Sequence, residues 1–163
     1  MLQTSYVLSL DKGPTGSSSW KPMLEIFSGL SETDIHELEK KPVEAVNLLL
    51  LDVKNPNSLK VILNKARENA RGMQDHITKE VWEQVNQLYH IVNDPGVEQK
   101  IMGSNSMELI DLLDQNSIMF YGVIDSTMPR GHGWQFLNLG KFIERCILTI
   151  EIAYAHSQKM EHR

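Results

Sequence analysis

The side chains most able to do chemistry in this chain are two adjacent charged residues, Glu144 and Arg145, at the end of the sequence TMPRGHGWQFLNLGKFIER. They follow a tight loop and stand in a helix that is otherwise largely apolar. A charge in such a helix is costly to bury unless an opposite charge satisfies it. The pair therefore indicates either a structural lock or a polar binding site.

A second group of charges lies in the sequence ARENAR, where Glu68 stands three residues before Arg71, a spacing that suits a pair on a helix surface. The simplest lock has Glu144 accepting a bidentate bond from Arg67 or Arg71. Removing one partner of such a buried pair would cost ~3–5 kcal/mol. The alternative is a pocket that binds a ligand. The ER pair and the candidate polar pocket together contain these charged residues: Glu144, Arg145, Arg67, Glu68, Arg71 and Arg130.

Other reactive arrangements are weaker in this sequence. Gly131 and Gly133 flank His132 ahead of a helix, where backbone amides could hold an anion together with Arg130, but a tight turn is the simpler interpretation. No histidine has a glutamate three residues before it, and no HExxH, CxxC or GxSxG sequence occurs. Cys146 lies on an apolar stripe and is expected in the core. We therefore expect no metal, no cofactor and no catalytic residues.

Composition places the chain among ordinary globular proteins. Its 163 residues fit one domain, with 41% hydrophobic and 23% charged residues and a net charge of -5. Because no basic stripe could follow a phosphate backbone, nucleic-acid binding is not expected. The sequence also contains no signal peptide and no apolar run near the ~20 residues of a membrane span. We expect a cytoplasmic protein that does not bind a membrane.

Helical signals run through most of the chain. Residues 1–19 contain LDKGPTGSSS and are expected to be a flexible segment ahead of a single helical domain, residues 20–163. Two short helices should follow, within WKPMLEIFSG and after a cap at Ser31. Pro42 then opens a third short helix, PVEAVNLLLLD, that is apolar enough to be nearly enclosed.

Four longer helices are expected after residue 58. The first ends before a cap at Thr78, the second ends at the turn NDPG, the third begins near Ser106 and the fourth near Gly133. Their apolar residues follow the helical period, and no segment alternates like a strand, so an all-α bundle is predicted. The stripe expected to face the core on the last helix contains Phe136, Leu139, Ile143, Cys146, Ile150 and Ala153.

The ordered series NPNS, ARENAR, EVWEQVNQLY and GVIDSTMPRGHGWQFLNLGKFIER resembles the Alpha-E family of bacterial all-helical proteins, which is named for its ER motif. The resemblance runs from about Trp20 to the C-terminus. It implies that Glu144 and Arg145 match the second of two ER helices in the family domain. The chain would then correspond to about half of that domain, as a truncated form or a short paralogue.

The resemblance implies a setting more than an activity. Alpha-E proteins are associated with ATP-grasp ligases, transglutaminase-like proteins and proteasome-like peptidases, and no catalytic residues of the family can be carried over. The first hypothesis is a non-catalytic partner or scaffold of a peptide synthesis or modification system. The alternative is an enzyme or carrier that binds a carboxylated peptide or amine substrate in an Arg/Glu-lined pocket. We also expect a homodimer in which a second copy covers an apolar face.

Overall fold

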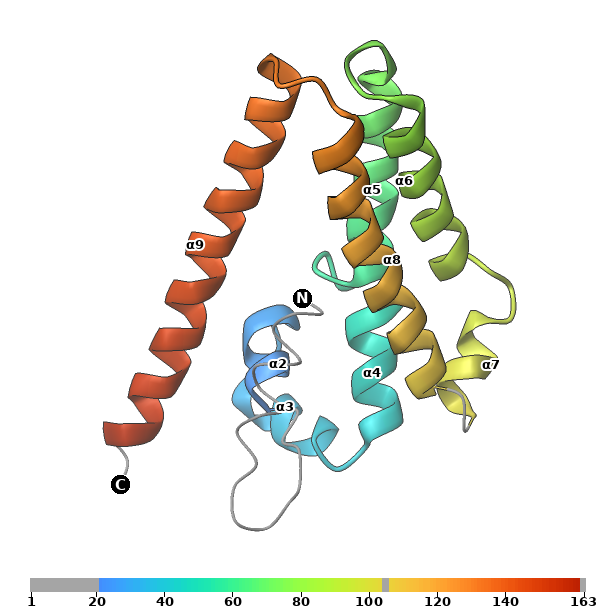
Figure 1. Ribbon diagram of the computed structural model, residues 1–163. Coiled ribbons are helices and arrows are strands. Elements are labelled where there is room, and N and C mark those ends of the chain that lie inside the picture. The colour runs from blue at the N-terminus through green and yellow to red at the C-terminus, as the bar shows by residue number, and fades with distance from the viewer. Residues whose placement is uncertain (1–20, 104–105, 162–163) are drawn as a thin grey trace.

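The computed structural model describes residues 21–103 and 106–161, and the described chain is built from helices, with no β-strand (Figure 1). This confirms the all-α fold. The expected flexible segment, residues 1–19, lies outside the described residues.

Three short helices begin the described chain: α2 (Lys21–Phe27), α3 (Glu32–Leu38) and α4 (Pro42–Leu50). They begin where local signals predicted. Ser31 caps α3, since its Oγ accepts a hydrogen bond from the backbone N–H of Asp34 at 3.4 Å, and proline occupies the first position of α4. Their apolar faces meet in a small core in which Leu24 and Ala45 are fully buried.

Two helices of equal length, α5 (Leu59–Gly72) and α6 (Lys79–Val92), form a hairpin joined by the short 3₁₀ helix η1 (Gln74–His76). Side-chain caps fix the start of each long helix. Ser58 Oγ accepts from the N–H of Val61 and Thr78 Oγ1 from that of Val81, both at 3.4 Å. The predicted cap at Thr78 is therefore confirmed.

The expected turn after α6 is present, because Asp94 Oδ1 accepts a hydrogen bond from the N–H of Gly96 at 2.8 Å. A short helix that the sequence did not predict follows it, α7 (Val97–Met102). Val97 and Ile101 are its buried residues. Two buried positions one turn apart are too few to show a period, so this helix was not predicted from the sequence.

The long helix α8 (Ser106–Thr127) packs along α6 and completes the main core. A buried polar contact lies within this packing, where Gln84 Nε2 donates to Asn116 Oδ1 at 3.1 Å. The main core draws on α4 to α8, and its buried residues are Val46, Leu50, Leu51, Leu59, Leu88, Val92, Val97, Ile101, Leu109 and Leu113.

The last helix, α9 (His132–Glu161), leaves this core as an arm (Figure 1). Its start packs closely on η1, since a Cβ added at Gly133 would lie 3.0 Å from the carbonyl oxygen of His76. Further along, its closest packing is against α2. Lys141 Nζ also lies 4.6 Å from the centre of the Tyr121 ring on α8.

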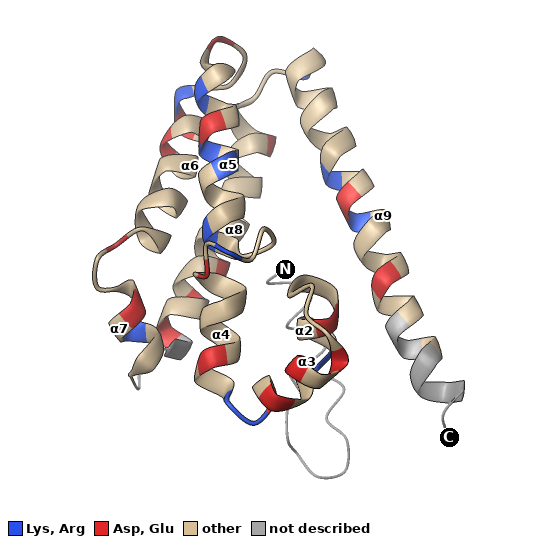
Figure 2. Ribbon diagram, turned by 180° about the vertical axis from the view of Figure 1, so that it is seen from behind, with Lys and Arg blue, Asp and Glu red and all other residues tan. Residues whose placement is uncertain are grey.

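The apolar stripe of α9 does not face the core, and the expectation that it would is wrong. Phe136, Ile143 and Ile150 are 72%, 52% and 68% exposed. Cys146, expected to be a buried core residue, is exposed as well. The reason is that α9 contacts the body through a different stripe, made by half-buried residues: Trp134, Leu137, Lys141, Leu148 and Ile152. Among the described side chains of α9, the charged ones gather around the middle of the helix (Figure 2).

Candidate functional site

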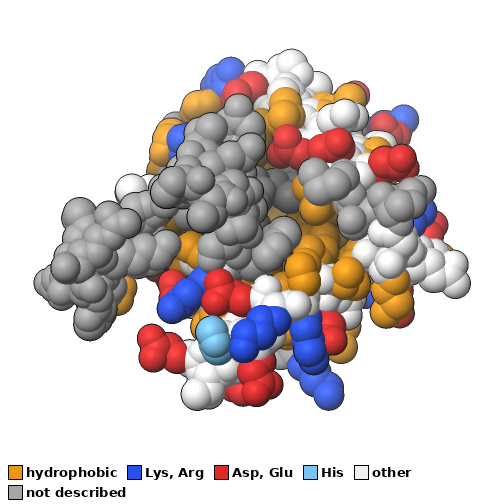
Figure 3. Space-filling view, turned by 90° about the horizontal axis from the view of Figure 1, so that it is seen from below, with side chains coloured by type: hydrophobic (Ala, Val, Ile, Leu, Met, Phe, Trp, Pro, Cys, Tyr) orange, Lys and Arg blue, Asp and Glu red, His pale blue; other side chains and the backbone are white. Residues whose placement is uncertain are grey.

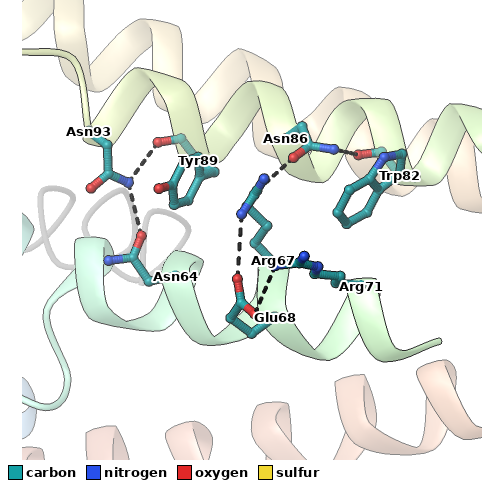
Figure 4. Close-up of polar contacts among 8 residues, drawn as sticks. All are labelled: Asn64, Arg67, Glu68, Arg71, Trp82, Asn86, Tyr89 and Asn93. Atoms are coloured by element: carbon teal, nitrogen blue, oxygen red, sulfur yellow. Dashed lines mark hydrogen bonds and ion pairs between the residues drawn. The ribbon is translucent and has the colours of Figure 1, made fainter. Parts of the chain in front are cut away.

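The side chain of Arg67, on α5, contacts three residues of α6 (Figure 4). Its Nε donates a hydrogen bond to Asn86 Oδ1 at 2.7 Å. Its guanidinium lies 4.4 Å from the centre of the Tyr89 ring and 5.7 Å from that of Trp82. The side chain is 25% exposed, so these cation–π and hydrogen-bond contacts are partly shielded from water. Arg67 thus joins α5 to α6.

Glu68 contacts both Arg67 and Arg71, the two arginines that were the alternative partners predicted for Glu144. Its Oε1 lies 3.4 Å from Arg67 Nη1, and its Oε2 lies 4.0 Å from Arg71 Nη1. The Glu68 and Arg71 side chains are 62% and 67% exposed, so these pairs add little stability. The expected pairing of Glu68 with Arg71 is present. Arg67 and Arg71 lie one turn apart on α5, and the negative charge of Glu68 reduces the repulsion between their positive charges.

A series of side-chain amides extends this contact along the hairpin (Figure 4). Asn93 Nδ2 donates to Asn64 Oδ1 and to the carbonyl oxygen of Tyr89, each at 2.9 Å. Asn86 Nδ2 donates to the carbonyl oxygen of Trp82 at 3.0 Å. Asn86 is thereby fixed with its oxygen toward Arg67. The arrangement rigidifies the α5–α6 pair, and the sequence analysis missed it because an asparagine gives no periodic signal.

Glu144 and Arg145 are exposed on α9, and no ion pair joins either of them to Arg67, Glu68 or Arg71. The bond from Arg67 or Arg71 to Glu144 is therefore not formed, and the lock predicted from the sequence is wrong. The physical reason is the course of α9, which packs against α2, while Arg67 contacts α6 and Arg71 pairs with Glu68 on its own helix. In water, neither charge carries the burial penalty that motivated the lock.

Arg130 belongs to a third place, the corner between α8 and α9. Its Nη2 donates to the carbonyl oxygen of Asp125 at 3.1 Å, and Nη1 lies 3.4 Å from Asp125 Oδ1. Its guanidinium also lies 4.3 Å from the centre of the Trp134 ring. These contacts hold the corner and do not direct Arg130 toward Arg67 or Glu144. The six predicted site residues therefore fall into three separate groups: Arg67, Glu68 and Arg71 on α5, Arg130 at the corner, and Glu144 with Arg145 on α9.

A groove of about 550 Å³ lies near the start of α9, where the sequence analysis placed no site. Its walls are mainly apolar, with His76, His132 and Asn69 as the polar exceptions. The lining residues are Ala66, Asn69, Ala70, Met73, His76, Ile77, Val81, Val85, Phe120, His132, Gly133, Phe136 and Leu137. Ala66 and Ala70 sit one turn apart on α5, and small side chains at that spacing leave room between helices. The spacing of Ala66 and Ala70 is the feature of the sequence that could have indicated the groove, although ordinary core helices show the same spacing.

Neither a metal-binding cluster nor a membrane-spanning helix occurs within residues 21–103 and 106–161. No group of three or more histidine, cysteine, aspartate or glutamate side chains there could hold a metal ion. No described helix combines the length and the apolar character needed to cross a membrane.

Comparison with known proteins identifies one family. The model of Alpha-E, described as a predicted alpha-helical domain with a conserved ER motif, matches residues 1–163. The match extends the resemblance, which began at about Trp20, to the N-terminal residues. No curated protein and no solved structure matches the chain. The helical architecture and the ER sequence at Glu144 and Arg145 agree with the family description. The chain therefore belongs to the Alpha-E family.

Proposed function

We propose that this protein is a non-catalytic helical scaffold that binds an ATP-grasp ligase or a transglutaminase-like protein. The system would carry out peptide synthesis or modification in a bacterial cytoplasm. The observation that carries the proposal is the apolar groove between α5, α6, α8 and the start of α9. The partner class comes from the resemblance to Alpha-E proteins. The expected homodimer is part of the same proposal.

The groove suits a protein segment better than it suits a charged substrate. Its few polar residues offer little to bind a carboxylate, whereas apolar walls accept the apolar face of a partner helix. Its volume, about 550 Å³, lies within the ~300–1,000 Å³ typical of binding clefts. The separation of Arg67, Arg130 and Glu144 further favours a scaffold over an Arg/Glu-lined pocket, because those charges converge on no common point.

The proposal is tested by measuring the affinity of the purified full chain for an ATP-grasp ligase and for a transglutaminase-like protein of the same organism. Isothermal titration calorimetry gives the affinity directly. Ala70→Trp fills the groove, and we expect it to weaken binding at least ~10-fold, which corresponds to about 1.4 kcal/mol. Gln87→Trp adds the same side chain to an exposed position on α6 and should leave binding unchanged.

Two results would contradict this function. The first is that neither partner binds, or that Ala70→Trp binds as tightly as the wild type while its circular dichroism shows an intact fold. The second is turnover of ATP or of an amine substrate by the purified protein alone, with loss of that activity in Glu144→Gln. The second result would favour the enzyme or carrier hypothesis.

A further inference from the structure

The outer face of α9 carries a continuous apolar stripe that no described part of the chain covers. Large side chains on this face and its edges are between 48% and 72% exposed. They are Phe136, Leu139, Phe142, Ile143, Ile147, Ile150 and Tyr154. At the lower end of the molecule, exposed hydrophobic side chains also gather together, with charged side chains of both signs around them (Figure 3). A helix that is apolar on two sides is normally buried on both.

The spacing on this face is that of a helix pair. Phe136, Leu139, Ile143, Cys146, Ile150 and Ala153 alternate steps of three and four residues. This is the a/d pattern of a coiled coil, in which side chains of one helix fill holes on a facing helix. The half-buried stripe through Leu137, Lys141 and Leu148 lies on the opposite side of α9, toward the body. The a/d face is therefore open to a second helix, and the body does not obstruct it.

We propose that α9 pairs antiparallel with α9 of a second copy of this chain, about a twofold axis that passes between Glu144 and Arg145. This develops the homodimer of the proposed function. It rests on the α9 face, which shares only Phe136 with the lining of the partner groove, so a substitution at Ile143 tests it separately from the groove. No charged residue of α9 occupies an a or d position between Phe136 and Ala153. The charged pair thus stays at the outer edges of the helix pair, in water.

The side-chain sizes select this register. With the axis between Glu144 and Arg145, Phe136 lies opposite the partner's Ala153, and Ile143 lies opposite the partner's Cys146. Leu139 lies opposite the partner's Ile150. Each of the two small residues thus meets a large one, which is how facing layers fill space without voids.

At the edge of the contact between the two α9 helices, a small residue again faces a large one. In the antiparallel register, Gly140 lies on the same edge as the partner's Ile147 and within one helical turn of it, so the residue with no side chain meets a large one. A Cβ added at Gly140 would meet no atom within 4 Å in the single chain, so the space beside it is open. A parallel pair would instead match Phe136 with the partner's Phe136 and Ala153 with the partner's Ala153. That arrangement crowds one layer and leaves a void in another.

The available area also fits a stable dimer. Large aromatic and aliphatic side chains that are half exposed or more present on the order of 100 Å² each, so the seven together offer roughly 700 Å². A stable interface of standard size buries ~800 Å² on each partner. The face of α9 therefore supplies most of one side of such an interface.

The first test is the mass of the purified full chain by sedimentation equilibrium over a range of concentrations. The chain mass is 18.6 kDa, and we expect twice that value. Ile143→Glu places a charge in the layer beside the axis and should give a monomer at the same concentrations. Met119→Glu on α8 is the matched control, because Met119 is 56% exposed against 52% for Ile143. The control should remain dimeric. Circular dichroism establishes that both variants are folded.

The second test fixes the register by disulfide formation in a Cys146→Ala background. The double variant Phe136→Cys with Ala153→Cys should form a cross-linked dimer on oxidation, while each single variant should not. A monomeric wild type, a dimer that survives Ile143→Glu, or cross-linking of the single Phe136→Cys variant would each overturn the proposal. The third of these results would specify a parallel pair.

Discussion

At the scale of single residues, the contacts of Arg67 explain why its charge can stand between two helices. Its guanidinium is satisfied by the fixed oxygen of Asn86 and by the faces of Tyr89 and Trp82. Glu68 adds an exposed countercharge. This geometry makes Arg67 part of the α5–α6 interface.

Replacing Arg67 with methionine keeps much of the apolar stem and removes the charge. We expect a loss of about 1–2 kcal/mol in the free energy of unfolding, because a hydrogen bond and cation–π contacts disappear. Urea denaturation of Arg67→Met, Asn86→Ala and the double variant measures how the two residues are coupled. A coupling energy of at least ~0.5 kcal/mol is expected, and strict additivity would show that the Asn86 contact contributes nothing.

Replacing Glu144 with glutamine separates the observed arrangement from the lock. Glu144 is exposed, so Glu144→Gln should change the free energy of unfolding by no more than ~0.5 kcal/mol. A buried lock with Arg67 or Arg71 would lose ~3–5 kcal/mol instead. Arg67→Met is the positive control in the same urea series. A large loss in Glu144→Gln would show that α9 packs on α5.

At the scale of the elements, caps determine where the two hairpin helices begin, and one cap also joins distant helices. Thr78 caps α6, and its Oγ1 lies 2.8 Å from Thr127 Oγ1 at the end of α8. One hydroxyl thus serves both the start of α6 and the α6–α8 contact.

Thr78→Ala should therefore cost about 1–2 kcal/mol of unfolding free energy, since a helix cap and an interhelical hydrogen bond are both lost. Thr78→Ser retains the hydroxyl and should recover most of that loss. Thermal and urea unfolding of the two variants measure the difference. Equal losses in both variants would assign the effect to packing of the threonine methyl group.

The helices themselves were largely predictable from local signals, and their packing was not. Ser31, Pro42 and Thr78 mark helix starts because a cap or a first-turn proline depends only on neighbouring residues. The apolar stripe of α9 correctly predicted a helix. The prediction that this stripe packs against the core of the same chain was wrong. A stripe shows that one face needs cover, while the residue pattern does not specify whether this chain or another supplies it.

The candidate site shows the same limit. Glu68 and Arg71 were paired correctly because they share one helix turn. Pairing Arg67 with Glu144 required the relative position of two distant helices, and α9 takes another course. The groove depends on the space that Ala66 and Ala70 leave against α6, α8 and the start of α9. Such a space arises only once the helices are assembled.

At the scale of the whole molecule, the described chain consists of a packed body of helices and a long helix, α9, that stands apart from it as an arm (Figure 1). The body encloses the main core between α4 and α8, and the groove lies where the arm leaves it. The arm carries the ER residues at its middle and an apolar face along its outer side. This division suits a protein whose role is to hold other chains, including its own copy.

Hydrogen exchange at different protein concentrations tests most directly whether the outer face of α9 is an interface between two copies of the chain. Pairing shields the α9 amides only where copies associate, so protection of residues 136–153 should rise with concentration, while the amides of α5 and α6 keep constant protection. In Ile143→Glu, the α9 amides should stay at the value of the dilute wild type. If the protection of the α9 amides in the wild type did not change with protein concentration, this result would contradict an interface between copies at α9.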